Sequence, residues 1–204
     1  RLAYSAGSGI GSICYGQPGL QTSDNNRFVK NWFEVEAAST GFDLVSSIAA
    51  KESLKTWFPY LKGGEFRKWY GNHDHVVNWR NDGEDIKTYV TDKYPYLNGN
   101  IDYVVKDRGY YFMPLVSYTK ITSGLFNARA AGEGFVFDVA GSSVFPSNEL
   151  RLPILGFLNS TLCNLFLKAQ NPTVNIQSGD VDNLPFVSDW VMKHSSAIEE
   201  VLTG

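Results

Sequence analysis

The sequence predicts an α+β protein in which a mixed, mostly antiparallel sheet comes first and a helical part follows. Short runs rich in aromatic and β-branched residues occupy most of the first 150 positions. Glycine-containing breaks at 123–124 and 131–134 separate several of these runs, as hairpin connections do. A longer run with helical apolar spacing comes after them. Strands with scattered helices, followed by a helical end, are typical of the α+β class.

Five segments carry the strand pattern. They are 27–35, 75–79, 115–120, 125–130 and 134–139. The segment 125–130 alternates with a period of two, which is the pattern of a strand with two different faces. One face holds Leu125, Asn127 and Arg129, and the other holds Phe126, Ala128 and Ala130.

Four segments carry helix signals. We expect helices at 42–51, starting near Thr40 or Asp43, and at 84–94, after the turn Asn81-Asp82-Gly83. The strongest signal covers 153–169, with Pro153 in its first turn and the sequence Asn171-Pro172 as its stop. A last helix is expected at 189–202 behind Ser188.

These elements predict a strand-rich core over 1–150 and a helical part over 151–204 that packs on it within one compact unit. The 204 residues are 43% hydrophobic, which is enough to bury a core, and their 14% aromatic content excludes a disordered chain. Two cysteines exclude a disulfide scaffold and a cysteine-ligated zinc site. The chain begins with Arg1 rather than Met, so we expect a fragment of a longer protein.

Membrane and secretion signals are weak. The first twenty residues contain no apolar block of signal-peptide length, and polar residues interrupt the apolar stretch 152–169. That stretch is therefore expected to be a buried helix, and the protein is expected to be cytoplasmic without a membrane partner.

Charge is distributed unevenly along the chain. The formal net charge is −3, yet residues 1–130 hold 15 basic and 13 acidic side chains, against 3 and 8 in 131–204. Basic residues, aromatic residues and glycines alternate in Lys62-Gly63-Gly64-Glu65-Phe66-Arg67-Lys68-Trp69-Tyr70. Such alternation suits a nucleic-acid surface, because cations contact phosphates and planar groups stack on bases. A solvated loop above packed aromatic residues remains the alternative.

Catalytic motifs are mostly missing. The sequence contains neither a phosphate-binding loop with Gly-Lys nor a Gly-x-Ser-x-Gly nucleophile turn. The cluster His73, Asp74 and Asp85 is a faint metal-site pattern, so a stand-alone metal-dependent nuclease or hydrolase stays open. The aromatic content keeps a protein- or carbohydrate-binding module open as well. We expect no catalytic residue, metal or cofactor in this chain itself.

Five groups of segments resemble, in order, the target recognition region of large adenine-specific DNA methyltransferases. These are the PglX-type enzymes of BREX phage-exclusion systems and, more distantly, type IIG restriction-modification enzymes. The segments are YGQPGLQTSDNNRF (15–28), KWYGN (68–72) with VVNW (76–79), YTKITSGLFNAR (118–129), GFVFD (134–138) with GSSVFP (141–146), and FLNS (157–160) with NPT (171–173) and GDVDNLP (179–185). Ser23 departs from the family, in which glycine is common.

The resemblance implies the part of such an enzyme that selects a site on double-stranded DNA. The S-adenosylmethionine-dependent catalytic domain would precede it in the same parent chain. Arginine pairs well with guanine and asparagine with adenine, so the candidate base-reading residues are Asn25, Asn26, Arg67, Asn72, Asn127 and Arg129. Arg27 belongs to the same candidate surface, Trp69 and Tyr70 are candidates to stack or pack, and the candidate phosphate contacts are Lys62, Lys68, Lys106, Lys120, Thr122 and Ser123.

Overall fold

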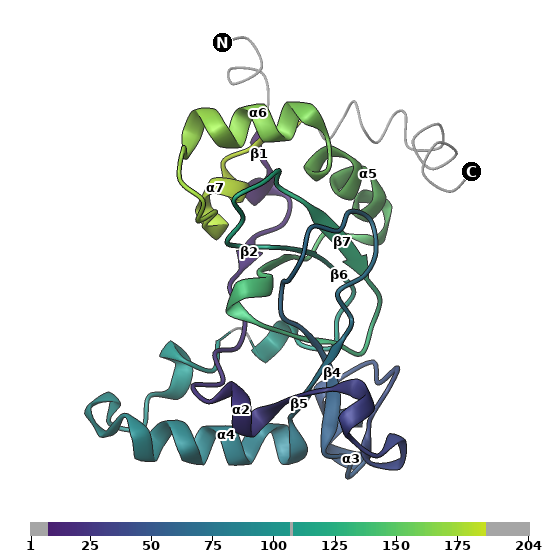
Figure 1. Cartoon of the computed structure of the whole chain (residues 1–204), viewed down its shortest axis with the longest axis vertical. Helices are drawn as coiled ribbons and strands as arrows, with labels where there is room; N and C mark the ends of the chain where they lie inside the picture. Colours follow the sequence, from purple (N-terminus) through teal and green to yellow (C-terminus); the bar gives the residue numbers. More distant parts are fainter. Residues whose placement is uncertain (1–7, 107, 187–204) are drawn as a thin grey trace.

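The computed structural model describes residues 8–106 and 108–186. Within these ranges the molecule is elongated, with α5, α6 and α7 at one end and α2, α3 and α4 at the other (Figure 1). The described strands form two four-stranded sheets and one two-stranded ribbon. The α+β class with mostly antiparallel strands is therefore confirmed.

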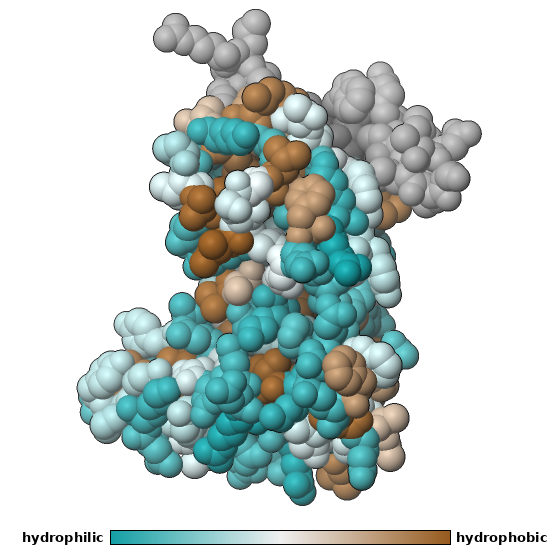
Figure 2. Space-filling model, in the orientation of Figure 1, coloured by the Kyte–Doolittle hydropathy of each residue, from teal (hydrophilic) through white to brown (hydrophobic). Residues whose placement is uncertain are grey.

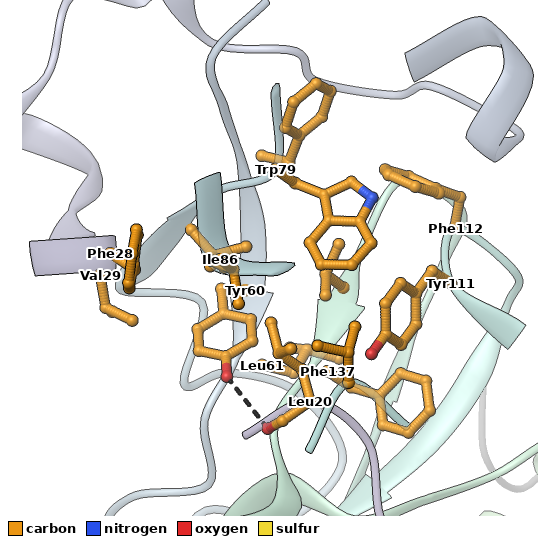
Figure 3. Packing of buried hydrophobic residues seen from close by; sticks show 14 of the residues in the cluster. Leu20, Phe28, Val29, Tyr60, Leu61, Trp79, Ile86, Tyr111, Phe112 and Phe137 are labelled. Carbon is orange, nitrogen blue, oxygen red and sulfur yellow. Dashed lines mark hydrogen bonds between the residues drawn. The ribbon is translucent and has the colours of Figure 1, made fainter. Parts of the chain in front are cut away.

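The first sheet has the order β3-β5-β4-β8. Its strands are β3 (Val29–Asn31), β4 (Trp57–Leu61), β5 (His75–Asn78) and β8 (Val136–Phe137). Only the pair β4–β8 is parallel. The helices α2 (Asn25–Phe28), α3 (Ser47–Glu52) and α4 (Arg80–Lys93) accompany this sheet. Its core is aromatic, with Tyr60, Trp79, Phe112 and Phe137 among the fully buried side chains (Figure 3).

The second sheet has the order β2-β9-β6-β7 and is antiparallel throughout. It consists of β2 (Gly16–Gln17), β6 (Leu115–Tyr118), β7 (Ala128–Ala131) and β9 (Ser143–Val144). A ribbon of β1 (Ser8–Gly9) and β10 (Pro185–Phe186) lies beside the helices α5 (Asn148–Leu158), α6 (Thr161–Gln170) and α7 (Ser178–Asp182). The second sheet shares a mainly aliphatic core with these helices, and this core contains residues from before and after position 150.

Short 3-10 helices connect many of these elements. They span Ile10–Ser12, Trp32–Glu34, Ala37–Ser39, Pro95–Leu97, Ile101–Tyr103, Arg108–Tyr110 and Val139–Gly141. The expected boundary after residue 150 lies inside α5, and residues before it contribute to both cores.

The strands predicted at 75–79 and 115–120 are confirmed as β5 and β6, which are slightly shorter. The segment 125–130 overlaps β7 only from Ala128 onward, and 134–139 contains the short β8. The segment 27–35 contains β3 between the end of α2 and a 3-10 helix, so most of it is not a strand. The strand β4 lies outside every predicted strand. It contains Pro59, which lacks an amide hydrogen and is unfavourable in a strand interior. The structure accommodates Pro59 because β8 pairs only with Tyr60 and Leu61 on that side.

The helix predictions are confirmed in part. Residues 81–83 have positive φ values, so regular turns of α4 begin at Glu84, as predicted. The helix expected at 42–51 begins later, because Asp43 has φ 56° and Ser46 is the residue that caps α3. The prediction of one helix over 153–169 is wrong. Ser160 caps a separate α6, and α5 and α6 meet at an angle of 73°.

The helix expected at 189–202 lies outside the described residues, whereas the stop after Gln170 is confirmed. Among the described residues, no single helix is long and apolar enough to cross a bilayer. The bent pair α5 and α6 meets that test only jointly, by length and composition.

Candidate nucleic-acid interface

The segment 62–74 joins β4 to β5 and is termed here the glycine-rich loop. Five of its residues have positive φ, namely Gly63, Gly64, Trp69, Gly71 and Asn72. Gly63 is required by close approach as well, since a Cβ there would lie 2.7 Å from the Ala140 carbonyl oxygen. The side-chain amide of Asn72 donates to the Glu65 carbonyl across the loop (3.0 Å). The loop is therefore a defined turn structure.

The glycine-rich loop lies against the outer edge of β7. The Trp69 amide donates to the Ala128 carbonyl and the Ala130 amide donates to the Trp69 carbonyl, both at 2.9 Å. This exchange makes a parallel bridge between Trp69 and Arg129. The loop thereby covers an edge that would otherwise be unpaired, and β7 fixes the backbone of Trp69.

Below the loop, Arg129 is buried, with only 2% of its surface exposed. Its guanidinium donates to Asn127 Oδ1 (2.5 Å), to Thr119 Oγ1 (3.1 Å) and to the Arg67 carbonyl (3.3 Å). Burial lowers the pKa of Arg129 to about 10, so the group is charged at neutral pH. Within the described residues no carboxylate forms an ion pair with it. Arg129 is therefore a buried cation held by neutral acceptors.

Lys68 is also held from below. Its ammonium donates to the Asn159 carbonyl (2.8 Å), and the Asn159 side chain exchanges two hydrogen bonds with the main chain of Ala128. Asn159 ends α5, so the loop, β7 and the helical end meet at this point. Asn159 and Thr119 are functional candidates that the residue-by-residue prediction missed. For Asn159, its place in one of the matching segments was the available signal.

The outer side of the loop exposes Arg67 together with Phe66, Trp69 and Tyr70. The Arg67 stem packs against Gly71, where a Cβ would lie 2.9 Å from Arg67 Cδ. The face shown in Figure 2 is mostly hydrophilic across the middle of the molecule. The loop thus combines a solvent-facing guanidinium with three solvent-facing rings on a fixed backbone.

A second group of predicted residues gathers around Ala140. Asn25 and Lys62 line one hollow of about 380 Å³, whose wall includes Ala140. The main-chain amide of Lys120 donates to the Ala140 carbonyl, which places the backbone of Lys120 next to Ala140. Ser23, at the hollow, has φ 62°, the left-handed conformation that glycine adopts easily. Glycine would therefore be the favourable residue at this position, and serine adopts the conformation with some backbone strain.

The floor of that hollow contains a buried hydrogen-bonded pair that sequence reasoning missed. The Tyr60 hydroxyl donates to Asp138 Oδ2 (2.6 Å) and lies 3.4 Å from the Leu20 carbonyl (Figure 3). Burial raises the pKa of Asp138, and hydrogen bonds from Tyr60 and from the Ala140 amide offset part of this rise. The pair ties the segment before α2 to β4 and β8.

The remaining candidates are separate from these two groups. Asn26 and Arg27 lie on α2, where the Arg27 guanidinium stacks on Phe28 and Tyr89. Lys106 lines another hollow, with Pro18 and Arg108 in its wall. Thr122 and Ser123 lie beside α6, in a small hollow that includes Lys168.

Four predicted DNA contacts therefore face inward in this structure. Asn72, Asn127 and Arg129 are 8%, 1% and 2% exposed, and the Lys68 ammonium is bound to a carbonyl. The metal alternative also lacks an assembled ligand set, because no three His, Cys, Asp or Glu side chains gather among the described residues. Asp85 lies on α4 and accepts a hydrogen bond from Asn78.

The sequence of the chain was compared with those of known proteins. No protein-family model matches the chain. The chain is 36% identical over 191 residues to the adenine-specific methyltransferase PglX of Lacticaseibacillus casei, strain Zhang, a match that covers 93% of the chain. It is 31% identical over 175 residues, or 84% of its length, to the adenine-specific methyltransferase BrxX of Escherichia coli O9:H4, strain HS. The matches span 15% and 13% of these two proteins. The resemblance to PglX-type methyltransferases is thus confirmed, and the chain is a relative of one segment of these adenine-specific methyltransferases.

Proposed function

We propose that the chain binds double-stranded DNA and selects the target site for an adenine-specific methyltransferase of phage defence or restriction-modification. One observation supports the proposal most: the glycine-rich loop holds Arg67 and three rings in solvent on a backbone fixed by β7. A preorganised loop loses little conformational entropy on entering a groove. Base edges are read by such projecting donors, and arginine bonded to guanine is the commonest specific contact.

In this proposal the two groups of residues have different tasks. Arg67 reads a base edge. Lys62, Lys120 and Asn25, which gather around Ala140, bind the DNA backbone or a flanking base. Among the described residues, the Lys62 and Lys120 ammonium groups form no ion pair. Arg129, Asn127 and Lys68 then position the loop from below.

The chemistry itself belongs, in this proposal, to the S-adenosylmethionine-dependent catalytic domain of the longer protein, which acts in the cytoplasm. Methylating an adenine within a duplex requires its extrusion from the stack, and a recognition part only decides which adenine is extruded. The relatives are several times longer than this chain, which leaves ample length for such a domain.

The salt dependence of DNA binding tests this division. The logarithm of the DNA-binding constant falls linearly with the logarithm of the salt concentration, and each lost phosphate contact makes this fall shallower by about 0.9. Lys62→Ala and Lys120→Ala are each expected to make it shallower by that amount, equally across DNA sequences. Lys51→Ala is the matched control, since this exposed lysine lies on α3 outside the candidate groups. An unchanged slope in both variants contradicts the phosphate role.

Base reading is tested separately with Arg67→Ala. The variant is expected to lose about 1–3 kcal/mol of affinity for the preferred sequence and to relax one position of the site. An equal loss on every sequence would assign Arg67 to the backbone instead. Metal-dependent cleavage of plasmid DNA by the chain alone would favour the nuclease alternative.

A further inference from the structure

Beside the glycine-rich loop lies an open hollow of about 540 Å³ with aromatic walls. Its lining includes the rings of Tyr70, His73 and Phe135 and the charged residues Asp43, Glu133 and Arg151. The Tyr70 ring meets the His73 ring edge-on at 4.7 Å, and the His73 ring lies 4.9 Å from Phe135 at a tilt of 46°. The three rings form one continuous wall, and Tyr70 is its exposed end.

This wall has an unsatisfied polar atom. His73 Nε2 is buried and has no hydrogen-bond partner among the described residues. Burial lowers the pKa of His73, and the nearby charge of Arg129 lowers it further. The imidazole is therefore neutral at neutral pH, and a neutral imidazole offers one donor and one acceptor. A buried polar atom without a partner is unusual, and this one belongs to a residue that lines the hollow.

Charge restricts the ligand. Arg151 in the lining and the nearby charge of the buried Arg129 offset the attraction of Asp43 and Glu133 for a cationic ligand. A free anion is disfavoured by the carboxylates of Asp43 and Glu133 in the same lining. A neutral planar ring fits both restrictions, and carboxylates accept hydrogen bonds from exocyclic amino groups of bases.

We propose that this hollow takes one unstacked DNA base that carries an exocyclic amino group, stacked on Tyr70 and hydrogen-bonded through that group by the carboxylates of the lining. The inference rests on the proposed function, because the glycine-rich loop, which includes Tyr70, must first bring DNA to the hollow. The methylated adenine itself belongs to the catalytic domain. The base in this hollow is therefore a different, displaced adenine, cytosine or guanine, and not the thymine left unpaired opposite the target, which carries no exocyclic amino group.

Binding to matched and bulged duplexes tests the inference with the 204-residue chain at low salt. One duplex is fully paired, and a second carries a single bulged adenine or 2-aminopurine. The bulged duplex is expected to bind about tenfold more tightly, since stacking one base on an aromatic ring contributes about 1–3 kcal/mol. The 2-aminopurine fluorescence is expected to fall on binding, because the base stacks on a ring.

The variants identify the hollow as the source of this preference. Tyr70→Ala is expected to remove the tenfold preference, whereas Tyr70→Phe keeps the ring and retains it. Tyr96→Ala is the matched control, because Tyr96 and Tyr70 are both 73% exposed and Tyr96 lies far along the chain, after α4. Tyr70 is a surface side chain, so its removal leaves folding intact.

Two results overturn the inference while leaving the proposed function in place. One is equal affinity for paired and bulged duplexes, and the other is a preference that survives Tyr70→Ala. Adenosine alone binding as tightly as the bulged duplex would assign the hollow to a free nucleoside and overturn the DNA assignment. Failure to bind either duplex overturns the proposed function and the inference together.

Discussion

Arg67 and Arg129 were both candidates to read bases, and they face opposite ways. Arg67 lies on the outer side of the glycine-rich loop and is exposed to solvent. Arg129 lies on β7 below the loop, is 2% exposed, and donates to the carbonyl of Arg67 itself. One arginine is thus presented by the loop, and the other holds the loop in place.

The difference shows that an alternating polar pattern in a strand does not by itself indicate a solvent face. Asn127 and Arg129 alternate with apolar residues in the sequence, yet both are buried, and the glycine-rich loop pairs with the outer edge of β7 at Arg129. Burying a guanidinium without a carboxylate partner is costly, and here three neutral oxygens accept its hydrogen bonds. Arg129 therefore holds the loop in place, whereas Arg67 is the residue that the loop exposes to solvent.

The largest effect on stability is expected from Arg129→Met. Met keeps much of the side-chain length but leaves the oxygens of Asn127, Thr119 and Arg67 without their donor. Each orphaned buried group costs about 1–3 kcal/mol, and relief from burying the charge offsets part of this, so we expect a loss of about 3 kcal/mol. Urea unfolding measures it. Unchanged or higher stability would mean that the buried charge costs more than its hydrogen bonds contribute.

Asn159→Ala is expected to have the next largest effect. It removes both hydrogen bonds between the Asn159 side chain and the main chain of Ala128, at 3.0 and 2.9 Å. We expect a loss of about 2 kcal/mol in urea unfolding. Asn26→Ala, at an exposed asparagine on α2, is the control and should change stability by less than about 0.5 kcal/mol. Equal effects of the two variants would show that Asn159 does not support the loop.

A smaller, pH-dependent effect is expected from His73 in the loop and His75 at the start of β5. Burial lowers the pKa of both His73 and His75 below 6.5 in the folded protein. As pH falls below about 6.5, the unfolded chain binds protons first, so stability decreases until the folded-state pKa values are reached. Urea unfolding at several pH values measures this slope. His73→Gln should make it shallower, and an unaltered slope would remove His73 as a contributor.

The smallest effect on stability is expected from Arg67→Ala, the counterpart of Arg129→Met. Its guanidinium faces solvent, and only the main-chain carbonyl of residue 67 supports Arg129. The alanine variant keeps that carbonyl, so the free energy of unfolding should change by less than about 0.5 kcal/mol while DNA affinity falls. Unfolding followed by circular dichroism and DNA titration of the same protein sample separate the two effects. A large loss of stability would place Arg67 with the supporting residues.

Several features could be predicted because local chemistry decides them. The turn Asn81-Asp82-Gly83 consists of residues that tolerate positive φ, and α4 becomes regular directly after it. The strands β5 and β6 are short runs rich in β-branched or aromatic residues, and both were located. The bend between α5 and α6 was missed, although Ser160 carries a capping signal, because apolar spacing continues across it.

By itself, the sequence determined the α+β class, the likeness to PglX-type methyltransferases and the segments in which basic and aromatic residues alternate. These depend on composition, on local periodicity and on residue order. Only the tertiary structure decided which of those cations face solvent. Arg67 and Arg129 are 62 positions apart, and the contact that buries one and presents the other joins a loop to the edge of β7. No local pattern contains that contact, because burial is a property of the packed chain rather than of the residue.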